Sequence, residues 1–266
     1  MRAGLSTRER TILDKLVSDE HLIVQAEDVS RIAQVDRSDA NVILSKLAKK
    51  GWLQRLVRGK YVVIPVGAAT DTPAAEFAWQ IASQLYAPCM ISGWSAAEHW
   101  GLTDQIFNVI SLVSRKSQRT KDQRVGGVRF RIRTLPAEKL FGGTNVWSGT
   151  IKSQVADPHR TLIDILDAPD FGGGGRHVAD IAKEYWKSRH ADDETLLAYA
   201  TRFDRGTVFK RMGLLAEQYG NPSEDWLRRC AAGCSRGISL FDPDGPSTGK
   251  IRSRWRIRVN IPLEET

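Results

Sequence analysis

The sequence predicts an α+β protein in which a small N-terminal domain precedes a larger mixed α/β domain with a helical C-terminal half. Three observations predict this fold class. Apolar residues recur at helical spacing in three short segments before residue 50, and a strand-turn-strand pattern follows them. Residues 67–73 are small or polar and have the composition of a linker. Beyond residue 74, strand patterns come first, and helical spacing dominates from Pro158 onward.

Length and composition exclude several other classes. The 266 residues suffice for two domains, and a chain with 41% hydrophobic and 26% charged residues is neither collagen-like nor disordered. No run approaches the roughly 20 apolar residues of a membrane-spanning helix, and the charged N-terminus does not resemble a secretory signal. We therefore expect a cytoplasmic protein without a membrane partner, whose three cysteines are structural thiols.

The first two helices are predicted from capping and periodicity. Ser6 and Glu9 form a capping box, which starts a helix from about Thr7 to Ser18. Residues 22–24 then make an apolar link, and a second helix over residues 26–33 places Val29 and Ile32 on one face.

The third helix is predicted to have two contrasting faces. Asp36 or Ser38 is its N-cap, and Gly51 ends it. One face is an apolar stripe made of Ala40, Ile43, Leu44 and Leu47. The other face carries Ser38, Asn41, Val42, Ser45 and Lys49.

A β-hairpin completes the first domain. Residues 52–57 and 60–63 have strand character, and Arg58-Gly59 forms the turn between them. Three short helices followed by such a hairpin predict a winged helix-turn-helix over residues 1–66, whose third helix can enter the major groove of DNA. The predicted DNA-binding residues are Arg37, Ser38, Asn41, Ser45, Lys49, Arg58 and Lys60. The alternative is that this polar face is only solvated and the domain contacts another protein.

The second domain is predicted over residues 74–266. It begins with a helix over 75–86, a strand over 89–91 and a short helix capped by Ser95 and Glu98. Strand patterns follow at 107–113, 127–133 and 150–155, and helices follow after Pro158. The four glycines at 172–175 predict a turn between helices, and residues 254–259 predict a final strand.

Positive charge is concentrated in three segments. The formal net charge is +8, yet residues 1–66 carry +4, residues 114–133 carry +7 and residues 250–258 carry +5. The rest of the chain therefore carries −8. Arginines alternate with other residues at 129, 131 and 133 and again at 252, 254, 256 and 258, so each row shares one face of a strand.

Two interpretations of these rows remain open. They are either two separate solvated faces or a second polyanion-binding surface that lengthens the DNA contact or binds RNA. The candidate residues of this second surface are Arg115, Lys116, Arg119, Arg129, Arg131, Arg133, Arg254 and Arg256.

No enzymatic motif is complete. The segment from Gly245 to Ile251 has three residues between its glycines where a P-loop needs four, and no histidine pair has metal-ligand spacing. The sequence therefore predicts no catalytic residue, no metal site and no cofactor. The alternative is a winged-helix nuclease or other nucleic-acid-modifying enzyme that uses the carboxylates near Asp164, where Asp167 follows at i+3.

Five segments spread over nearly the whole chain carry a resemblance to a known family. They are residues 58–65 (RGKYVVIP), 91–103 (ISGWSAAEHWGLT), 155–164 (VADPHRTLID), 210–215 (KRMGLL) and 255–260 (WRIRVN). In this order they resemble AbiEi-type antitoxins of type IV, abortive-infection toxin–antitoxin systems. The arginine-dense segment 252–258 departs from the family pattern.

This resemblance implies a function with two parts. The winged helix would bind inverted repeats in the promoter of its own operon and repress transcription. The second domain would counteract a nucleotidyltransferase-like toxin, with which family members need not form a stable complex.

Overall fold

The computed structural model describes residues 3–18, 23–64, 75–148 and 151–263. The predicted linker over 67–73 and the domain boundaries beside it lie outside these residues and stay predictions. The chain separates into two compact units, and each is described by itself. One unit comprises residues 1–85 with 122–130, and the other comprises residues 86–121 with 131–266.

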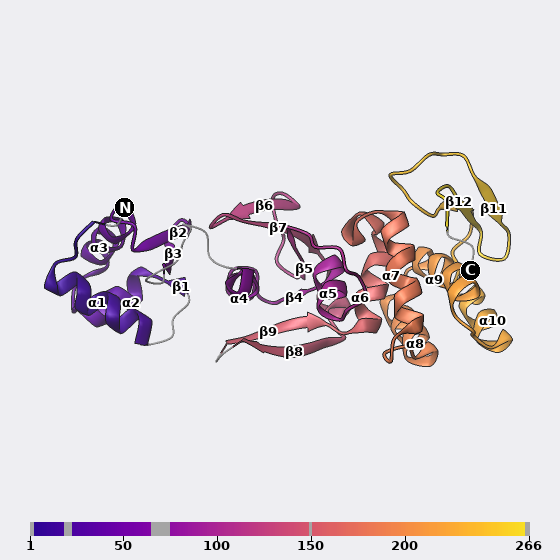
Figure 1. Cartoon of the computed structure of the whole chain (residues 1–266), viewed down its shortest axis with the longest axis horizontal. Coiled ribbons are helices and arrows are strands. Elements are labelled where there is room, and N and C mark those ends of the chain that lie inside the picture. The colour runs from indigo at the N-terminus through magenta and orange to yellow at the C-terminus, as the bar shows by residue number, and fades with distance from the viewer. Residues whose placement is uncertain (1–2, 19–22, 65–74, 149–150, 264–266) are drawn as a thin grey trace. The chain divides into compact units, whose positions relative to one another are not determined.

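Residues 3–18 and 23–64 form three helices and a small antiparallel sheet (Figure 1). In chain order the elements are α1 (Thr7–Ser18), β1 (Ile23–Val24), α2 (Ala26–Ala33), α3 (Arg37–Lys49), β2 (Leu53–Val57) and β3 (Lys60–Val63). The strands lie in the order β1-β3-β2. Helices α1 and α2 have the predicted bounds, and the Ser6–Glu9 capping box is present, because each backbone N–H donates to the other residue's side chain.

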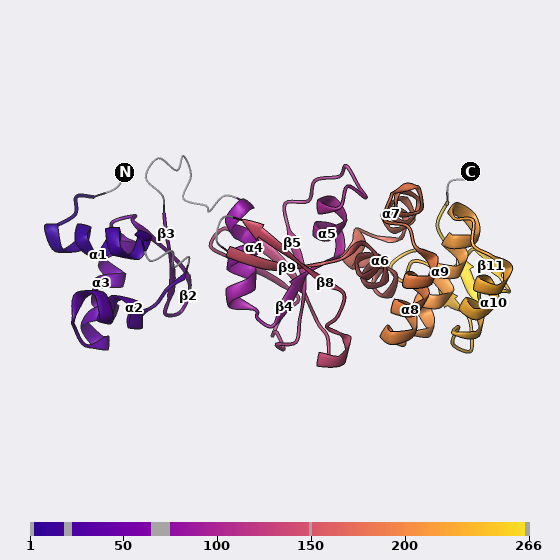
Figure 2. The same cartoon turned by 90° about the horizontal axis from the view of Figure 1, so that it is seen from below.

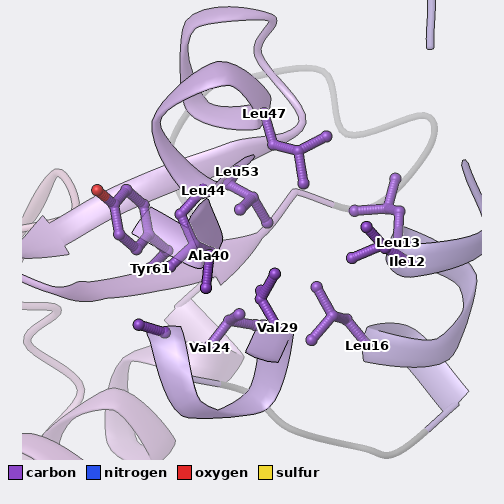
Figure 3. Close-up of a cluster of buried hydrophobic side chains, with 11 residues drawn as sticks. Ile12, Leu13, Leu16, Val24, Val29, Ala40, Leu44, Leu47, Leu53 and Tyr61 are labelled. Carbon is purple, nitrogen blue, oxygen red and sulfur yellow. The ribbon is translucent and has the colours of Figure 1, made fainter. Parts of the chain in front are cut away.

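A single hydrophobic core joins these helices to the hairpin. Figure 3 shows the side chains of α1, α2 and α3 turned toward one another, with Leu53 and Tyr61 added from the two strands. Leu16, Val29, Leu44 and Leu47 are fully buried. Burial of each such side chain contributes on the order of 1.5–3 kcal/mol, so the core holds α3 in one orientation.

The strands between residues 89 and 156 form a six-stranded sheet in the order β6-β7-β5-β4-β9-β8. The strands β4 (Cys89–Ile91), β5 (Ile110–Ser114), β6 (Asp122–Val125), β7 (Val128–Thr134), β8 (Gly143–Ser148) and β9 (Ile151–Ala156) accompany the helices α4 (Ala75–Leu85) and α5 (Gly93–His99). Strand β4 pairs antiparallel with β5 and parallel with β9. The strand predicted at 89–91 is confirmed, whereas β6 and β8 were not predicted because they are edge strands rich in polar residues.

The C-terminal part is helical, as predicted. Its elements are α6 (Pro158–Asp167), α7 (Gly175–Lys187), α8 (Asp193–Phe203), α9 (Gly206–Tyr219) and α10 (Glu224–Ala232), with short 3-10 turns at Ala137–Lys139 and Pro169–Gly172. Figures 1 and 2 show α6 to α9 packed side by side, and α10 lies against α9. The predicted turn at 172–175 is present, with Gly173 and Gly174 at φ of +90° and +97°.

The final strand predicted over residues 254–259 is confirmed only for residues 257–259. Strands β10 (Ser239–Leu240), β11 (Lys250–Arg252) and β12 (Ile257–Val259) form a small sheet, and residues 253–256 are the turn between β11 and β12. Trp255 is fully buried, and Arg256 takes a left-handed backbone with φ of +48°. Because residues 253–256 form this turn, arginines 252, 254, 256 and 258 do not share one sheet face.

No helix within the described residues is long and apolar enough to span a lipid bilayer.

Candidate nucleic-acid interface

Helix α3 has well-defined ends. Of the two N-caps that the sequence leaves open, the structure has Asp36, whose carboxylate accepts a hydrogen bond from the backbone N–H of Asp39 at 2.8 Å. After the helix, Gly51 takes a φ of +79°, a left-handed conformation that favours glycine. Asp36 and Gly51 therefore mark the two ends of α3.

The two faces of α3 are separated as predicted. Ala40, Leu44 and Leu47 are buried in the core. The exposed side chains of the helix are Arg37, Ser38, Asp39, Asn41, Val42, Ser45, Lys46 and Lys49. The structure therefore places all five predicted DNA-binding residues of this helix on its exposed side. Lys46 lies among them and was missed, although its spacing from Val42 and Lys49 indicates the same side.

Two of these side chains have contacts within the first unit. The Asn41 amide donates a hydrogen bond to the backbone carbonyl of Arg37 at 2.9 Å. The Arg37 guanidinium lies 3.1 Å from the Glu27 carboxylate, and both side chains are more than half exposed. Because an exposed ion pair of this kind contributes only about 0–1 kcal/mol, Arg37 can leave Glu27 for another anion at little cost.

The hairpin presents further cations. Val57 pairs with Lys60, which makes Arg58-Gly59 the two-residue turn that the sequence predicts, and Gly59 has a φ of +76°. Arg58 is exposed and Lys60 is half-buried. Within the described part of the chain neither side chain forms an ion pair. Arg55 of β2 is also exposed and was not singled out from the sequence.

Two of the candidate cations of the second surface are used inside their own unit. The Arg133 guanidinium donates to the Asp167 carboxylate at 2.6 Å and to the Asp164 carbonyl at 3.1 Å, and its side chain is 19% exposed. Arg131 lies over the ring of Trp94, 5.4 Å from its centroid, and donates to the carbonyl of Asp170 at 3.4 Å. These contacts connect β7 to α6 and to the 3-10 turn that follows it.

Arg254 and Arg256 stand in the C-terminal turn and not in a strand. Arg254 forms ion pairs with Glu217 at 3.3 Å and with Glu224 at 2.5 Å. Arg256 is exposed and donates to the carbonyl of Cys234 at 3.5 Å. The Arg254 contacts are exposed ion pairs that hold the turn against α9 and α10.

The remaining four candidates of the second surface are exposed. Arg115, Lys116 and Arg119 lie in the segment between β5 and β6, and Arg129 lies on β7. Arg129 belongs to the first unit and has a further contact of its own, whereas Arg115, Lys116 and Arg119 belong to the second unit.

The carboxylates near Asp164 serve packing. Asp164 is fully buried, and its two oxygens accept hydrogen bonds from Arg160 at 2.9 and 3.0 Å and from the Ser92 hydroxyl at 2.6 Å. Asp167 is the partner of Arg133. Among the described residues no group of three His, Cys, Asp or Glu side chains could hold a metal ion. This geometry gives the nuclease alternative no support.

Arg160 is a structural residue that sequence reasoning missed. Its guanidinium donates to Asp164 and to the carbonyls of Lys139 and Phe141, at 2.6 and 3.1 Å respectively. It also lies over the rings of Phe141 and Phe203. The i, i+4 spacing of Arg160 and Asp164 on one helix was the available signal.

Together the fold and these surfaces define a mixed α+β protein whose exposed cations gather on α3, on the β2–β3 hairpin and between β5 and β7. No protein-family model and no curated protein matches the chain. Among solved structures, the chain is similar to the RV2827C protein from Mycobacterium tuberculosis, with a TM-score of 0.70 and 17% sequence identity. The match covers 96% of this chain and 92% of the other. At this identity the likeness shows a common fold alone.

Proposed function

We propose that this protein binds double-stranded DNA through its N-terminal domain, with α3 in the major groove. The order helix, strand, helix, helix and hairpin matches a winged helix-turn-helix, which supports the proposal. The observation that carries it is the division of α3 into a buried apolar face and an exposed face of small polar and basic residues. The major groove of B-DNA admits an α-helix, and polar side chains on its exposed face can then hydrogen-bond to base edges.

Each side chain has a distinct role in this proposal. Asn41 and Ser45 hydrogen-bond to base edges, and Asn41 exchanges its bond to the Arg37 carbonyl for one to a base. Arg37 binds guanine or a phosphate, and Ser38 and Lys49 bind phosphates at the two ends of the helix. Arg58 and Lys60 of the hairpin bind the neighbouring backbone. This function needs no cofactor and no catalytic residue.

We further propose that the protein represses its own promoter and acts as an antitoxin against a nucleotidyltransferase-like toxin. The five segments that resemble AbiEi-type antitoxins support this part, because they extend from the hairpin to the C-terminal turn. Two copies would occupy the two halves of an inverted repeat, as the two-fold symmetry of such a site requires. Antagonism of the toxin does not require a stable complex.

The double variant N41A/S45A tests the DNA-binding proposal. Selection from a library of random duplexes defines the sequence that the wild-type protein prefers. The variant should then lose about 1–3 kcal/mol for each base contact removed, measured as the ratio of affinities for the preferred and an unrelated duplex.

A matched control is T11A/S18A on α1, because both hydroxyls are exposed and bond only to carbonyls of their own helix. The control should keep the wild-type preference. An N41A/S45A variant with unchanged preference would mean that another face of the domain reads the DNA, and a wild-type protein that binds no duplex would contradict the proposal altogether.

A further inference from the structure

The segment between β5 and β6, residues 115–121, is a cationic loop. Its sequence is Arg-Lys-Ser-Gln-Arg-Thr-Lys, and it contains four cations and no acid. The side chains of Arg115, Lys116, Arg119 and Lys121 are all exposed. We call this segment the basic loop.

Hydrogen bonds hold the basic loop at both ends. The Ser114 hydroxyl accepts from the backbone N–H of Lys116 at 2.9 Å and donates to the carbonyl of Tyr86 at 2.7 Å. At the other end, the carbonyl of Lys121 accepts from the backbone N–H of Ile132 at 2.8 Å. Within the loop, the Gln118 amide donates to the carbonyl of Lys116 at 3.0 Å. A loop fixed in this way loses less conformational entropy when it binds a ligand.

The four cations of the basic loop have a different environment from Arg133 and Arg254 of the same unit. None of the ion pairs formed among the described residues involves them, whereas Arg133 has Asp167 and Arg254 has Glu217 and Glu224. Like charges close together in sequence repel one another, and this repulsion is relieved when a polyanion binds.

The composition of the loop indicates which polyanion it fits. It has no aromatic residue on which the bases of a single strand could stack, and no apolar residue to insert into a lipid bilayer. Lysine is depleted from the cores of protein–protein interfaces, where aromatic residues are enriched. All seven side chains can donate hydrogen bonds, and Arg, Lys, Ser, Thr and Gln are the residues that bind the phosphates of duplex DNA.

We infer that the basic loop binds phosphates of duplex DNA through Arg115, Lys116, Arg119 and Lys121, as a second DNA-contacting surface in addition to α3 and the hairpin. This inference rests on the proposed function, because it assigns a further surface to the same ligand. The contacts are independent of base sequence, so they increase affinity and leave preference unchanged.

The triple variant R115S/K116S/R119S tests this inference. The affinity of the full-length protein is measured at several salt concentrations, both for the preferred duplex and for an unrelated duplex of equal length. Each phosphate contact contributes about 0.9 to the slope of log affinity against log salt, so the loss of three contacts should reduce its magnitude by roughly 2.7. The ratio of affinities for the two duplexes should stay at the wild-type value.

Two further variants show whether a change in slope comes from lost phosphate contacts of the basic loop. The alternatives are a lower overall charge of the protein and a misfolded variant. K187S/R228S/R229S removes the same formal charge from exposed residues that already have carboxylate partners, and its slope should equal that of the wild type. R115K/R119K keeps every charge in the basic loop, so it should keep the wild-type slope. A fall in slope that is equal in the triple variant and in the paired-residue control would overturn the inference.

The outcomes also distinguish this inference from the function on which it rests. A wild-type protein that binds neither duplex overturns both. When the wild type binds and N41A/S45A loses its preference, but the triple variant keeps the wild-type slope, only the inference about the basic loop fails. The loop would give that result if it served an acidic protein or an anionic lipid surface.

Discussion

Arg160 and Asp164 show at the scale of single residues how this fold holds a buried charge. The guanidinium and the carboxylate form two parallel hydrogen bonds, at 2.9 and 3.0 Å, and both side chains are fully buried. The remaining donors of Arg160 reach two backbone carbonyls, and the Ser92 hydroxyl donates to Asp164. Every charged atom therefore has a partner, which burial requires.

Removal of one partner should destabilise the second unit strongly. Arg160→Met leaves the Asp164 carboxylate buried without its counter-ion, and we expect a loss of about 3–5 kcal/mol in the free energy of unfolding. The double variant R160M/D164L leaves no charge behind and should lose less. Urea unfolding followed by tryptophan fluorescence measures both, and equal losses in the two variants would show that packing and not charge pairing dominates here.

Residue periodicity predicted the exposed side of α3 but not the partners of the arginines on β7. The alternation of Arg129, Arg131 and Arg133 correctly indicates one face of a strand. The groups that cover this face, Asp167 and the carbonyl of Asp170, lie more than 30 residues further along the chain. A local pattern identifies a face but cannot identify what packs on it.

At the scale of elements, the side chain of Trp255 packs the hairpin of β11 and β12 against α9. Trp255, in the turn between β11 and β12, is fully buried against Gly213 of α9, and its indole N–H donates to Glu217 at 2.8 Å. A Cβ atom at residue 213 would overlap the six-membered ring of Trp255. The glycine inside α9 is therefore explained by close packing, despite its low helix propensity.

Gly213→Ala should accordingly destabilise the protein. Alanine stabilises a helix by about 1 kcal/mol relative to glycine, whereas overpacking a core costs about 1–3 kcal/mol. The overlap involves a rigid and fully buried ring, so we expect the cost to exceed the gain. In a Trp255→Leu background the same change should cost less, and thermal unfolding of the four members of this cycle measures the coupling. Additive effects would mean that residues 213 and 255 are independent.

Elements in which apolar residues recur at regular helical or strand spacing were predicted from the sequence, and elements without such spacing were missed. Helices α1 and α2 have the predicted bounds because their caps and apolar spacing agree. Strand β6 contains Asp122, Gln123 and Arg124, which give no alternation to detect. In the turn at 253–256, the period of two was present and misleading, because a buried residue between exposed ones also occurs in a tight turn.

At the scale of the whole molecule, the 39 lysines and arginines behind the formal charge of +8 include both exposed and internal cations. Arg131, Arg133 and Arg160 are used in contacts that stabilise their own unit. Exposed cations are spread over both units, and those of α3, of the β2–β3 hairpin and of the basic loop are among them. Charge counted along the sequence therefore overstates the positive surface of the second domain and correctly indicates residues 115–121 as part of it.

The proposed assignment of DNA binding to the first domain and toxin antagonism to the second makes the two activities separable. We expect the variant N41A/S45A/R58S/K60S to bind its operator at least about 30-fold more weakly, because two base contacts alone contribute about 2–6 kcal/mol. Expressed from an unrelated promoter, the same variant should still restore growth to cells that express the nucleotidyltransferase-like toxin. A reporter fused to the operator measures the loss of repression, and colony counts measure the rescue, with T11A/S18A as the control for both. Failure of the variant to rescue growth, at a cellular concentration equal to that of the wild type, would place part of the antitoxin activity in the first domain, since all four substituted residues lie there.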